Sequence, residues 1–263
     1  MHDSKVEVLV AAVNKDAIEL YNKMKIATNA VIANQGDTYC YLEKMICDRR
    51  VRVIETAGQG VGKNRNLALM CAEGEYLLFS DEDIVYRDGY EKMVIDAFER
   101  HPDADMLIFD INFLGEVREE KIEVEKRIFV FNAMKYGTPR FVIKRDSLRK
   151  VNIWFSLLYG GGAPHACGED SLFLREILRK KLKVYTVPAI IADLKQEEST
   201  WFHGYNDKYF KDKGMLIANM FPFFCHFLIF IFSERFAKKT NEYTFLDIYR
   251  LMKAGIRYYK NRK

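Results

Sequence analysis

The sequence predicts an α/β fold with a mostly parallel sheet flanked by helices. Short apolar runs alternate with helical patterns over the first two thirds of the chain, and acidic or glycine-rich segments follow several of these runs directly. The 263 residues are 49% hydrophobic and 30% charged, enough for one sizeable core, and this composition excludes a disordered or collagen-like chain.

The individual elements follow from the spacing of apolar residues. Residues 6–13 (VEVLVAAV) predict the opening strand, and helical spacing over 16–25 with Asp16 as the cap predicts the first helix. The other expected strands are 31–33, 51–55, 76–79, 106–111, 127–131, 141–144 and 184–191, the last interrupted by Pro188. The other expected helices are 41–47, 62–72, 88–100 and 169–180, with an exposed hairpin or loop at 116–126 and a flexible loop at 160–162.

A change of pattern near residue 205 predicts a boundary between a catalytic domain, 1–205, and a C-terminal aromatic and basic helical segment, 206–263. Residues 1–200 contain 29 Lys and Arg against 32 Asp and Glu, whereas residues 201–263 contain 12 against 5. A basic tail on a near-neutral body suggests contact with a negatively charged surface, such as a membrane or nucleic acid, unless it is an ordinary solvated helix face.

Residues 215–232 are mostly apolar but are interrupted by Asn219, Pro222 and His226. A membrane-spanning helix needs about 20 predominantly apolar residues. We therefore expect this segment to lie on a membrane or to pack against the protein, and not to span a bilayer.

The five cysteines are odd in number and show no CxxC spacing, which argues against a disulfide framework or a zinc site. The N-terminus runs directly into an apolar strand pattern without the architecture of a signal peptide. Both features predict a cytoplasmic location.

Three acidic residues, Asp81, Glu82 and Asp83, directly follow the apolar run 76–79. Ligands gather at the carboxyl ends of strands in an open parallel sheet, and residues two apart in an extended segment point to the same side. Asp81 and Asp83 are therefore candidates to hold one divalent cation, Mn²⁺ or Mg²⁺, together with phosphates. The alternative is an acidic turn that caps the next helix.

The segment from Gly58 to Arg65 (GQGVGKNR) places glycines before a predicted helix, with Lys63 and Arg65 beside them. It does not match the P-loop pattern, because Ala57 and Asn64 stand where a glycine and a Ser or Thr are required. A pyrophosphate contact at the helix N-terminus and an ordinary strand-to-helix connection both remain open.

Glu169 and Asp170 precede an apolar helix and follow the glycine-rich loop. One interpretation is helix capping by acidic residues in the first turn, and the other is a general base at Asp170. Among the five histidines, His203 in a polar, aromatic stretch is the best candidate for a site role.

The order of these motifs resembles that of family 2 glycosyltransferases of the GT-A fold. The resemblance covers residues 5–205 and includes the segments GKNRNLA (62–68), AEGEYLLF (72–79), Asp81-Glu82-Asp83 and Glu169-Asp170. Asp170 follows Asp83 by 87 residues, within the range typical of the family.

By position, the resemblance implies that Asp81 and Asp83 bind the metal ion at the donor diphosphate and that Asp170, paired with Glu169, deprotonates the acceptor. The implied nucleotide-sugar pocket consists of Asn14, Asn34, Lys63, Arg65, Asp81 and Glu82. The sequence departs from the family at Asn64, where Ala is usual, and it has no His directly before Ser199-Thr200. Either His203 is the third metal ligand, or the ion keeps only carboxylates and water.

We therefore expect an inverting, metal-dependent glycosyltransferase that uses a nucleotide-diphosphate sugar, with a UDP-sugar favoured. The implied acceptor is a glycan or a lipid-linked hydroxyl in surface polysaccharide or glycolipid synthesis. Two alternatives are a sugar nucleotidyltransferase and a catalytically silent GT-A scaffold. Residues 215–239 are expected to touch the cytosolic face of a membrane, the catalytic body or a second copy in a homodimer, and no nucleic-acid partner is expected.

Overall fold

The computed structural model describes residues 4–114, 121–165, 167–195 and 204–261. The chain divides into two units, the first made of residues 1–157 and 169–198 and the second of residues 158–168 and 199–263. Residues 158–168 thus fold with the C-terminal segment, and the predicted division at residue 205 stays a prediction.

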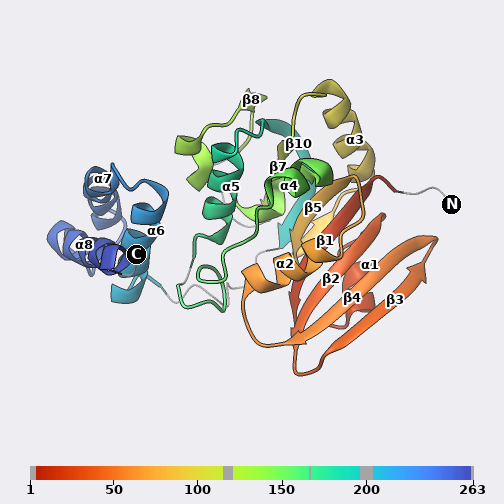
Figure 1. Cartoon of the computed structure of the whole chain (residues 1–263), viewed down its shortest axis with the longest axis horizontal. Helices are drawn as coiled ribbons and strands as arrows, with labels where there is room; N and C mark the ends of the chain where they lie inside the picture. Colours follow the sequence, from red (N-terminus) through yellow and green to blue (C-terminus); the bar gives the residue numbers. More distant parts are fainter. Residues whose placement is uncertain (1–3, 115–120, 166, 196–203, 262–263) are drawn as a thin grey trace. The chain divides into compact units, whose positions relative to one another are not determined.

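Among the described residues, ten strands of the first unit form one mixed sheet in the order β3-β4-β2-β1-β5-β9-β7-β10-β6, with β8 paired to β10 (Figure 1). The pairs β1–β2, β1–β5, β2–β4 and β7–β10 are parallel, which confirms the predicted mostly parallel α/β fold. The strands are β1 (Val6–Val13), β2 (Asn29–Gly36), β3 (Cys40–Ile46), β4 (Arg49–Ala57), β5 (Tyr76–Asp81), β6 (Ile84–Tyr86), β7 (Met106–Leu114), β8 (Lys126–Arg127), β9 (Phe141–Lys144) and β10 (Val184–Lys195).

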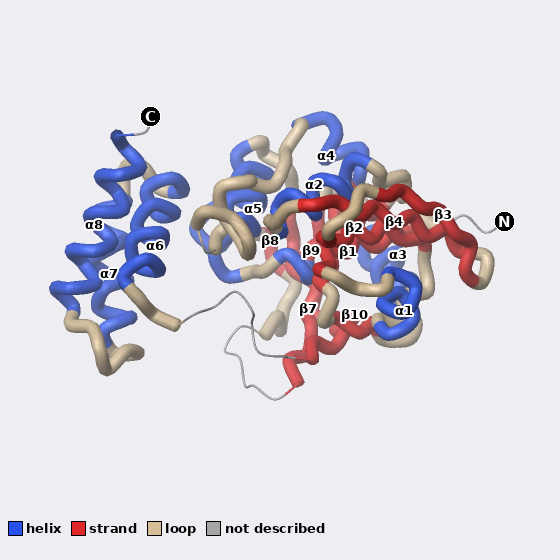
Figure 2. The backbone as a smooth tube through the Cα atoms, turned by 90° about the horizontal axis from the view of Figure 1, so that it is seen from below, coloured by secondary structure: helices blue, strands red, loops and turns tan. Residues whose placement is uncertain are grey.

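Helices cover both faces of this sheet, α1 and α3 on one side and α2 and α5 on the other (Figure 2). On the first face, Val8 and Val10 of β1 share a buried cluster with Leu20 and Val94. On the second, the ring of Phe79 meets those of Phe155 and Phe173 edge-on, at 5.2 and 5.6 Å between centroids. The helices are α1 (Ala17–Lys23), α2 (Val61–Met70), α3 (Tyr90–Arg100), α4 (Arg145–Val151) and α5 (Glu169–Arg179), with 3₁₀ turns η1 (Val130–Lys135) and η2 (Thr138–Arg140).

The first helix begins where its cap predicts. The Asp16 carboxylate accepts hydrogen bonds from the backbone N–H groups of Ile18 and Glu19, both at 2.9 Å. These bonds favour the charged form and lower the pKa of Asp16. The strand predictions at 31–33, 51–55, 76–79, 106–111 and 141–144 and the helix predictions at 62–72, 88–100 and 169–180 are also confirmed, with shifted ends.

The predicted helix at 41–47 is wrong, because these residues form β3, an edge strand antiparallel to β4. Cys47 and Asp48 both have left-handed backbones, with φ of 47° and 62°. Two successive left-handed residues form the tight turn that joins twisted antiparallel strands. This turn, and not the helix-like spacing of Tyr41 and Met45, determines the local structure.

The predicted strand at 127–131 is largely wrong, since β8 ends at Arg127 and η1 follows. Of this run only Ile128 is buried, whereas Phe129 and Phe131 are exposed. The predicted last strand is confirmed and extends to Lys195, and its pairing with β7 shifts register around Pro188, which has no N–H to donate.

The described residues of the second unit contain α6 (Asp207–Met220), α7 (Cys225–Ala237) and α8 (Phe245–Asn261). Helices α6 and α8 approach closely at two glycines, where a Cβ on Gly214 or Gly255 would overlap a carbonyl oxygen of the facing helix. The apolar run 215–232 does not form one helix, because α6 ends at Met220 and α7 begins at Cys225. None of the helices in the described ranges is both long and apolar enough to cross a membrane.

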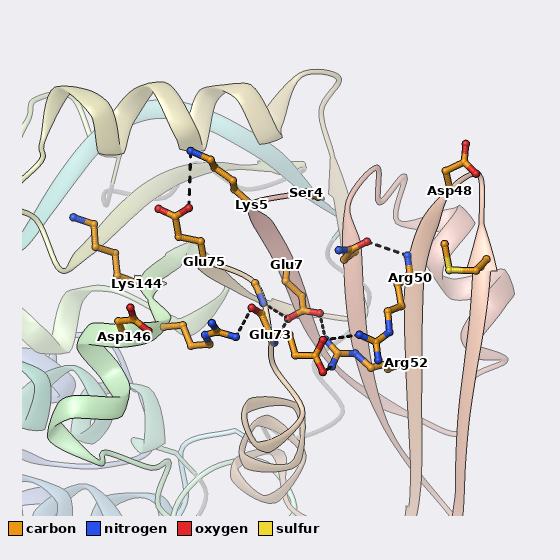
Figure 3. Close-up of a pocket in the computed structure, with 14 residues that line it drawn as sticks. Ser4, Lys5, Glu7, Asp48, Arg50, Arg52, Glu73, Glu75, Lys144 and Asp146 are labelled. Carbon is orange, nitrogen blue, oxygen red and sulfur yellow. Dashed lines mark hydrogen bonds and ion pairs between the residues drawn. The ribbon is translucent and has the colours of Figure 1, made fainter. Parts of the chain in front are cut away.

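An ion-pair network surrounds a cavity of about 850 Å³ at the amino ends of the parallel strands (Figure 3). The buried Arg52 guanidinium pairs with Glu7, which is 1% exposed, and with Glu73 at 2.8 Å. The second oxygen of Glu7 accepts hydrogen bonds from the backbone N–H groups of Glu73 and Gly74, at 2.7 and 2.9 Å. This pair thus holds the turn between α2 and β5.

We expect Arg52→Met to lower the free energy of unfolding by about 3–5 kcal/mol, because it leaves the Glu7 carboxylate buried without its counter-charge. Urea unfolding of the full chain measures this change. Lys92→Met, which removes the exposed partner of Asp96 on α3, is the control and should leave stability near wild type. An Arg52→Met variant as stable as the control would contradict the structural role of the network.

Candidate active site

Four parallel strands end at the same edge of the sheet, opposite the Arg52 network. β1 ends at Val13, β2 at Gly36, β4 at Ala57 and β5 at Asp81. The register pairs Ala12 with Asn34, Gly36 with Ala57 and Ala11 with Asp81. Since ligands of open α/β sheets bind at this edge, it is the candidate site.

Asn34 secures the turn after β1. Its amide accepts a hydrogen bond from Lys15 N at 3.2 Å and donates to Lys15 O at 2.8 Å, and the side chain is almost fully buried. Asn14 lies in this turn with φ of 50°. Asn34 therefore holds the turn after β1 through its side-chain amide, and Asn14 is part of the same turn at the edge of the site.

The glycine-rich segment before α2 is held in place by hydrogen bonds. Gly58 and Gly60 have φ of 97° and 133°, in the region that favours glycine. Lys63 Nζ donates to Ala57 O at 2.6 Å, so in this structure the lysine bridges the loop that it follows. Gly60 N donates to the buried side chain of Gln35 at 3.1 Å, which ties the loop to β2. The loop is thereby held against the end of β2.

Asn64, the departure from the family pattern, has a clear structural role. Its side chain is fully buried and donates to Ala12 O at 2.9 Å. Two residues on, Asn66 exchanges hydrogen bonds with the backbone of Phe155, at 2.8 and 3.0 Å. These side chains fasten α2 to β1 and to the segment before residue 158, a function that the sequence pattern did not reveal.

The guanidinium of Arg65 is the centre of the site. Nη2 donates to Asp81 Oδ1 at 2.8 Å and Nη1 donates to Glu169 Oε1 at 2.9 Å, although the Arg65 side chain is only 4% exposed. Burial alone lowers the pKa of Arg65, but the charges of Asp81, Glu169 and Asp170 outweigh burial and raise it. The Phe155 ring lies 5.4 Å below the guanidinium. One permanently charged group thus joins two acidic motifs that are far apart in sequence.

The acidic triplet forms a turn between two strands. β5 ends at Asp81 and β6 begins at Ile84, so Glu82 and Asp83 do not continue an extended segment. The expectation that residues two apart point to the same side therefore does not apply beyond Asp81. The alternative, that the acidic turn caps the next helix, is wrong because that helix begins only at Tyr90. Glu82 accepts a hydrogen bond from Val13 N at 2.8 Å and lies 3.4 Å from Lys15 Nζ. Glu82 thereby ties the β5–β6 turn to the end of β1.

Glu169 and Asp170 are the first residues of α5 and differ in environment. Glu169 is buried and paired with Arg65, whereas Asp170 is partly exposed and accepts a hydrogen bond from Ser171 N at 2.8 Å. Asp170 Oδ2 also lies 3.7 Å from the position that a Cβ on Gly137 would take, which brings the turn before η2 to the site. Sequence reasoning missed Gly137, for which no motif gave a signal.

The donor atoms at this edge suit a hard divalent cation, since Asp81 and Asp83 offer carboxylate oxygens. Across the described ranges, no three His, Cys, Asp or Glu side chains are grouped so that they hold a metal ion by themselves. Two carboxylates fit a cation that takes its other ligands from phosphates and water. His203, the predicted third ligand, lies outside the described residues.

A mostly parallel α/β sheet with acidic residues after a central strand and at the start of a later helix defines the class of GT-A glycosyltransferases. The model of the family described as Glycosyl transferase family 2 matches residues 37–181, more than half of the chain, and the chain belongs to this family. The resemblance seen in the sequence is thereby confirmed. No curated protein sequence matches the chain.

Solved structures of the S. aureus protein TarS share the fold. TarS 1–349 in complex with UDP-GlcNAc is 16% identical with a TM-score of 0.61, and the match covers 81% of this chain and 65% of that one. The complex of TarS 1–349 with UDP is 16% identical with a TM-score of 0.56 and the same coverage. A longer TarS structure is 17% identical with a TM-score of 0.57, covering 81% of this chain and 40% of that one. This chain thus spans less than two thirds of the length of these structures.

We expect Arg65→Met to lower the free energy of unfolding by about 3–5 kcal/mol, because Asp81 and Glu169 are then left close together without a counter-charge. Arg65→Lys keeps the charge, but a single ammonium does not reproduce the two separate Nη contacts, so an intermediate loss is expected. Urea unfolding of the three proteins tests this order. Equal stability of the wild type and Arg65→Met would contradict the role assigned to the guanidinium.

Proposed function

We propose that the protein transfers a sugar, with inversion, from a nucleotide-diphosphate sugar to a hydroxyl of a glycan or lipid-linked acceptor. The observation that carries this proposal is the Arg65 bridge between Asp81 and Glu169, because it gathers both acidic motifs of a family 2 glycosyltransferase at the carboxyl edge of the sheet. Complexes of TarS with UDP-GlcNAc and with UDP support a UDP-sugar as the donor.

The two acids of α5 have different proposed roles. Glu169 is paired with Arg65 and buried, so it acts by holding the guanidinium and the N-terminus of α5 in place. Asp170 is the proposed general base and accepts the proton of the acceptor hydroxyl as the hydroxyl oxygen attacks the anomeric carbon. The bond from that carbon to the nucleotide diphosphate breaks in the same displacement, on the opposite side, which inverts the anomeric configuration.

The proposed divalent cation, Mn²⁺ or Mg²⁺, is held by Asp81 and Asp83 and, when bound, offsets the negative charge that develops on the leaving diphosphate. Asn14, Asn34 and Glu82 contribute by fixing the backbone at the ends of β1 and β2, against which the nucleotide is proposed to lie. Lys63 is proposed to contact the diphosphate through its ammonium group. To do so, the ammonium group gives up its hydrogen bond to Ala57 O.

A panel of UDP-, GDP- and TDP-sugars, each with and without Mn²⁺, tests the proposed function through nucleotide release and thermal stabilisation. We expect one donor to stabilise the protein and to be turned over only with the cation. Asp83→Ala should abolish the cation-dependent stabilisation, whereas Asp170→Asn should retain it and lose at least a hundredfold in rate.

Activity that survives Asp170→Asn would remove this residue from the base role. Donor binding without turnover would favour the catalytically silent scaffold. Formation of a nucleotide sugar from a nucleoside triphosphate would favour the sugar nucleotidyltransferase.

We also propose that the protein works at the cytosolic face of a membrane, in the synthesis of a surface polysaccharide or glycolipid. The support comes from α7 and the residues before it, where Phe223, Phe224, Phe227, Phe230 and Ile231 are all exposed, Phe223 by 93%. Phe227, Phe230 and Ile231 are spaced so that they lie on one stripe of α7, and Phe223 and Phe224 directly precede this helix. The stripe is followed along α7 by the Glu234–Lys238 ion pair, with Arg235 and Lys239 nearby. Such a segment can insert its apolar side chains into a membrane surface while its basic side chains meet anionic headgroups. The five cysteines, odd in number and without CxxC spacing, support a location in a reducing compartment such as the cytosol.

We expect the full chain to sediment with vesicles that contain anionic lipid, and less so as salt increases. The double variant Phe223→Gln/Phe227→Gln should bind at least tenfold more weakly, because it removes two large exposed apolar side chains from α7 and the turn before it. Tyr39→Gln, a change at an exposed aromatic residue of the first unit, is the control. Unchanged sedimentation of the double variant would contradict the proposal, and a dimer that dissociates in this variant would identify a second copy as the partner of α7.

A further inference from the structure

Three aromatic rings pack together next to Arg65 and connect the elements that carry the acids. Phe79 of β5, Phe155 and Phe173 of α5 are all almost fully buried. The rings of Phe155 and Phe173 are stacked, with 3.9 Å between their centroids and 5° between their planes, and Phe79 meets both rings edge-on. Phe155 therefore contacts both the strand that leads to the acidic triplet and the helix that carries the two later acids.

Phe173 gives α5 a second point of attachment. Glu169, four residues earlier, is held by Arg65, and residues four apart lie on the same face of a helix. At 1.5 Å per residue the two contacts are about 6 Å apart along the helix axis. One contact alone leaves a helix able to tilt about it, whereas two contacts on one face fix its direction. Because Asp170 follows Glu169 in the first turn, these two contacts also determine where Asp170 lies.

The backbone that carries the Phe155 ring lies outside the helices and strands and is held by a side chain of α2. Asn66 Oδ1 accepts a hydrogen bond from Phe155 N at 2.8 Å, and Asn66 Nδ2 donates to Phe155 O at 3.0 Å. A primary amide offers a donor and an acceptor together, so one Asn side chain satisfies both backbone groups of a buried residue that no ladder or helix supports.

The same face of α2 approaches this segment one turn earlier. A Cβ on Gly62 would overlap Ser156 O, so the backbones of the two segments are in close contact there. Gly62 and Asn66 are four residues apart and share this face of the helix. Arg65 precedes Asn66, and its guanidinium lies 5.4 Å from the centroid of the Phe155 ring. The Asn66 amide therefore holds a ring that contacts both the central cation of the site and α5.

We propose that Asn66 is a positioning residue of the candidate active site. Its amide fixes the backbone of Phe155, the Phe155 ring stacks on Phe173, and this stack sets the placement of Asp170 in the first turn of α5. The catalytic part of this inference rests on the proposed function, because it takes Asp170 as the base. The packing part does not, and it is measured separately. All of these residues belong to the first unit of the chain.

Hydrogen exchange of the full chain tests the packing. In Asn66→Ala the amides of residues 173–176 should exchange at least tenfold faster, because the stack on α5 loses its support, while amides of β1 and β2 keep their wild-type protection. The matched control is Asn29→Ala, which removes one amide contact, to Arg50 N at the amino edge, and should leave α5 unchanged.

Phe155→Leu tests the same connection from the other end and decides the question if Asn66→Ala does not fold. Leu keeps an apolar side chain but has no ring to stack on Phe173, so exchange in α5 should again be faster. Wild-type exchange at residues 173–176 in either folded variant would overturn the inference.

Kinetics with the donor identified by the nucleotide-sugar panel test the catalytic consequence, at a temperature at which circular dichroism shows each variant to be folded. Asn66→Ala should lower kcat by about tenfold to a hundredfold, as for a misplaced general base. The donor KM should stay within about threefold, since the proposed cation ligands Asp81 and Asp83 are not on α5. Asn29→Ala should keep the wild-type kcat.

The double variant Asn66→Ala/Phe155→Leu should be at most about twofold slower than the slower single variant, because both changes break one connection. Faster exchange in α5 with unchanged kcat, a change in KM alone, or effects that multiply would each refute the positioning role. A wild type that turns over none of the donors would refute the proposed function and with it the catalytic role of Asn66, and the exchange result would still decide whether Asn66 holds α5.

Discussion

The burial of the Arg65 guanidinium is the constraint on which the candidate site depends. A charge removed from water is stable only where opposite charges and hydrogen-bond acceptors surround it. Asp81 and Glu169 meet this requirement from the end of β5 and the beginning of α5, and Phe155 closes the remaining side. An arrangement that separates the two acids leaves the buried arginine with at most one of these two charge partners. The same contact that satisfies the arginine therefore assembles the site, so stability and site geometry are coupled at this point.

The two edges of the parallel sheet use charge differently. At the amino edge, Arg52 pairs with Glu7 and Glu73, and Glu7 also accepts two backbone hydrogen bonds. The Glu7 side chain is 1% exposed, and its contacts fix the turn between α2 and β5. At the carboxyl edge, Asp81 shares only one guanidinium and its side chain is 34% exposed, beside the partly exposed Asp83 and Asp170. Accessible carboxylates also occur at the amino edge, where the Glu73 side chain is 58% exposed, so exposure alone does not decide between the edges. The chemistry is assigned to the carboxyl edge because Arg65 joins both acidic motifs of the family there.

The sequence predicts what local rules determine. Asp16 caps α1, and apolar alternation and helical spacing place most strands and helices, because each depends on neighbours within a few residues. The errors occur where other constraints dominate. At Cys47-Asp48, a tight left-handed turn converts an expected helix into β3, and at Glu82-Asp83 a turn replaces an extended segment. The family resemblance identified Arg65, Asp81 and Glu169, but the contacts that join these residues are long-range in the sequence. No spacing rule pairs Arg65 with Glu169, or Asn64 with the carbonyl of Ala12.

The loop before α5 is held by residues that lie beyond the family pattern. The family match ends at residue 181 and includes the loop 158–168, yet the groups that hold this loop, Lys208 and Asp212, lie on α6 beyond the match. The loop has few large apolar side chains and four glycines, so its own residues supply little of the energy that orders it. An external attachment is then a physical requirement for a defined conformation. Because that attachment comes from Lys208 and Asp212 of α6, the conformation of residues 158–165 depends on side chains that the family pattern does not include.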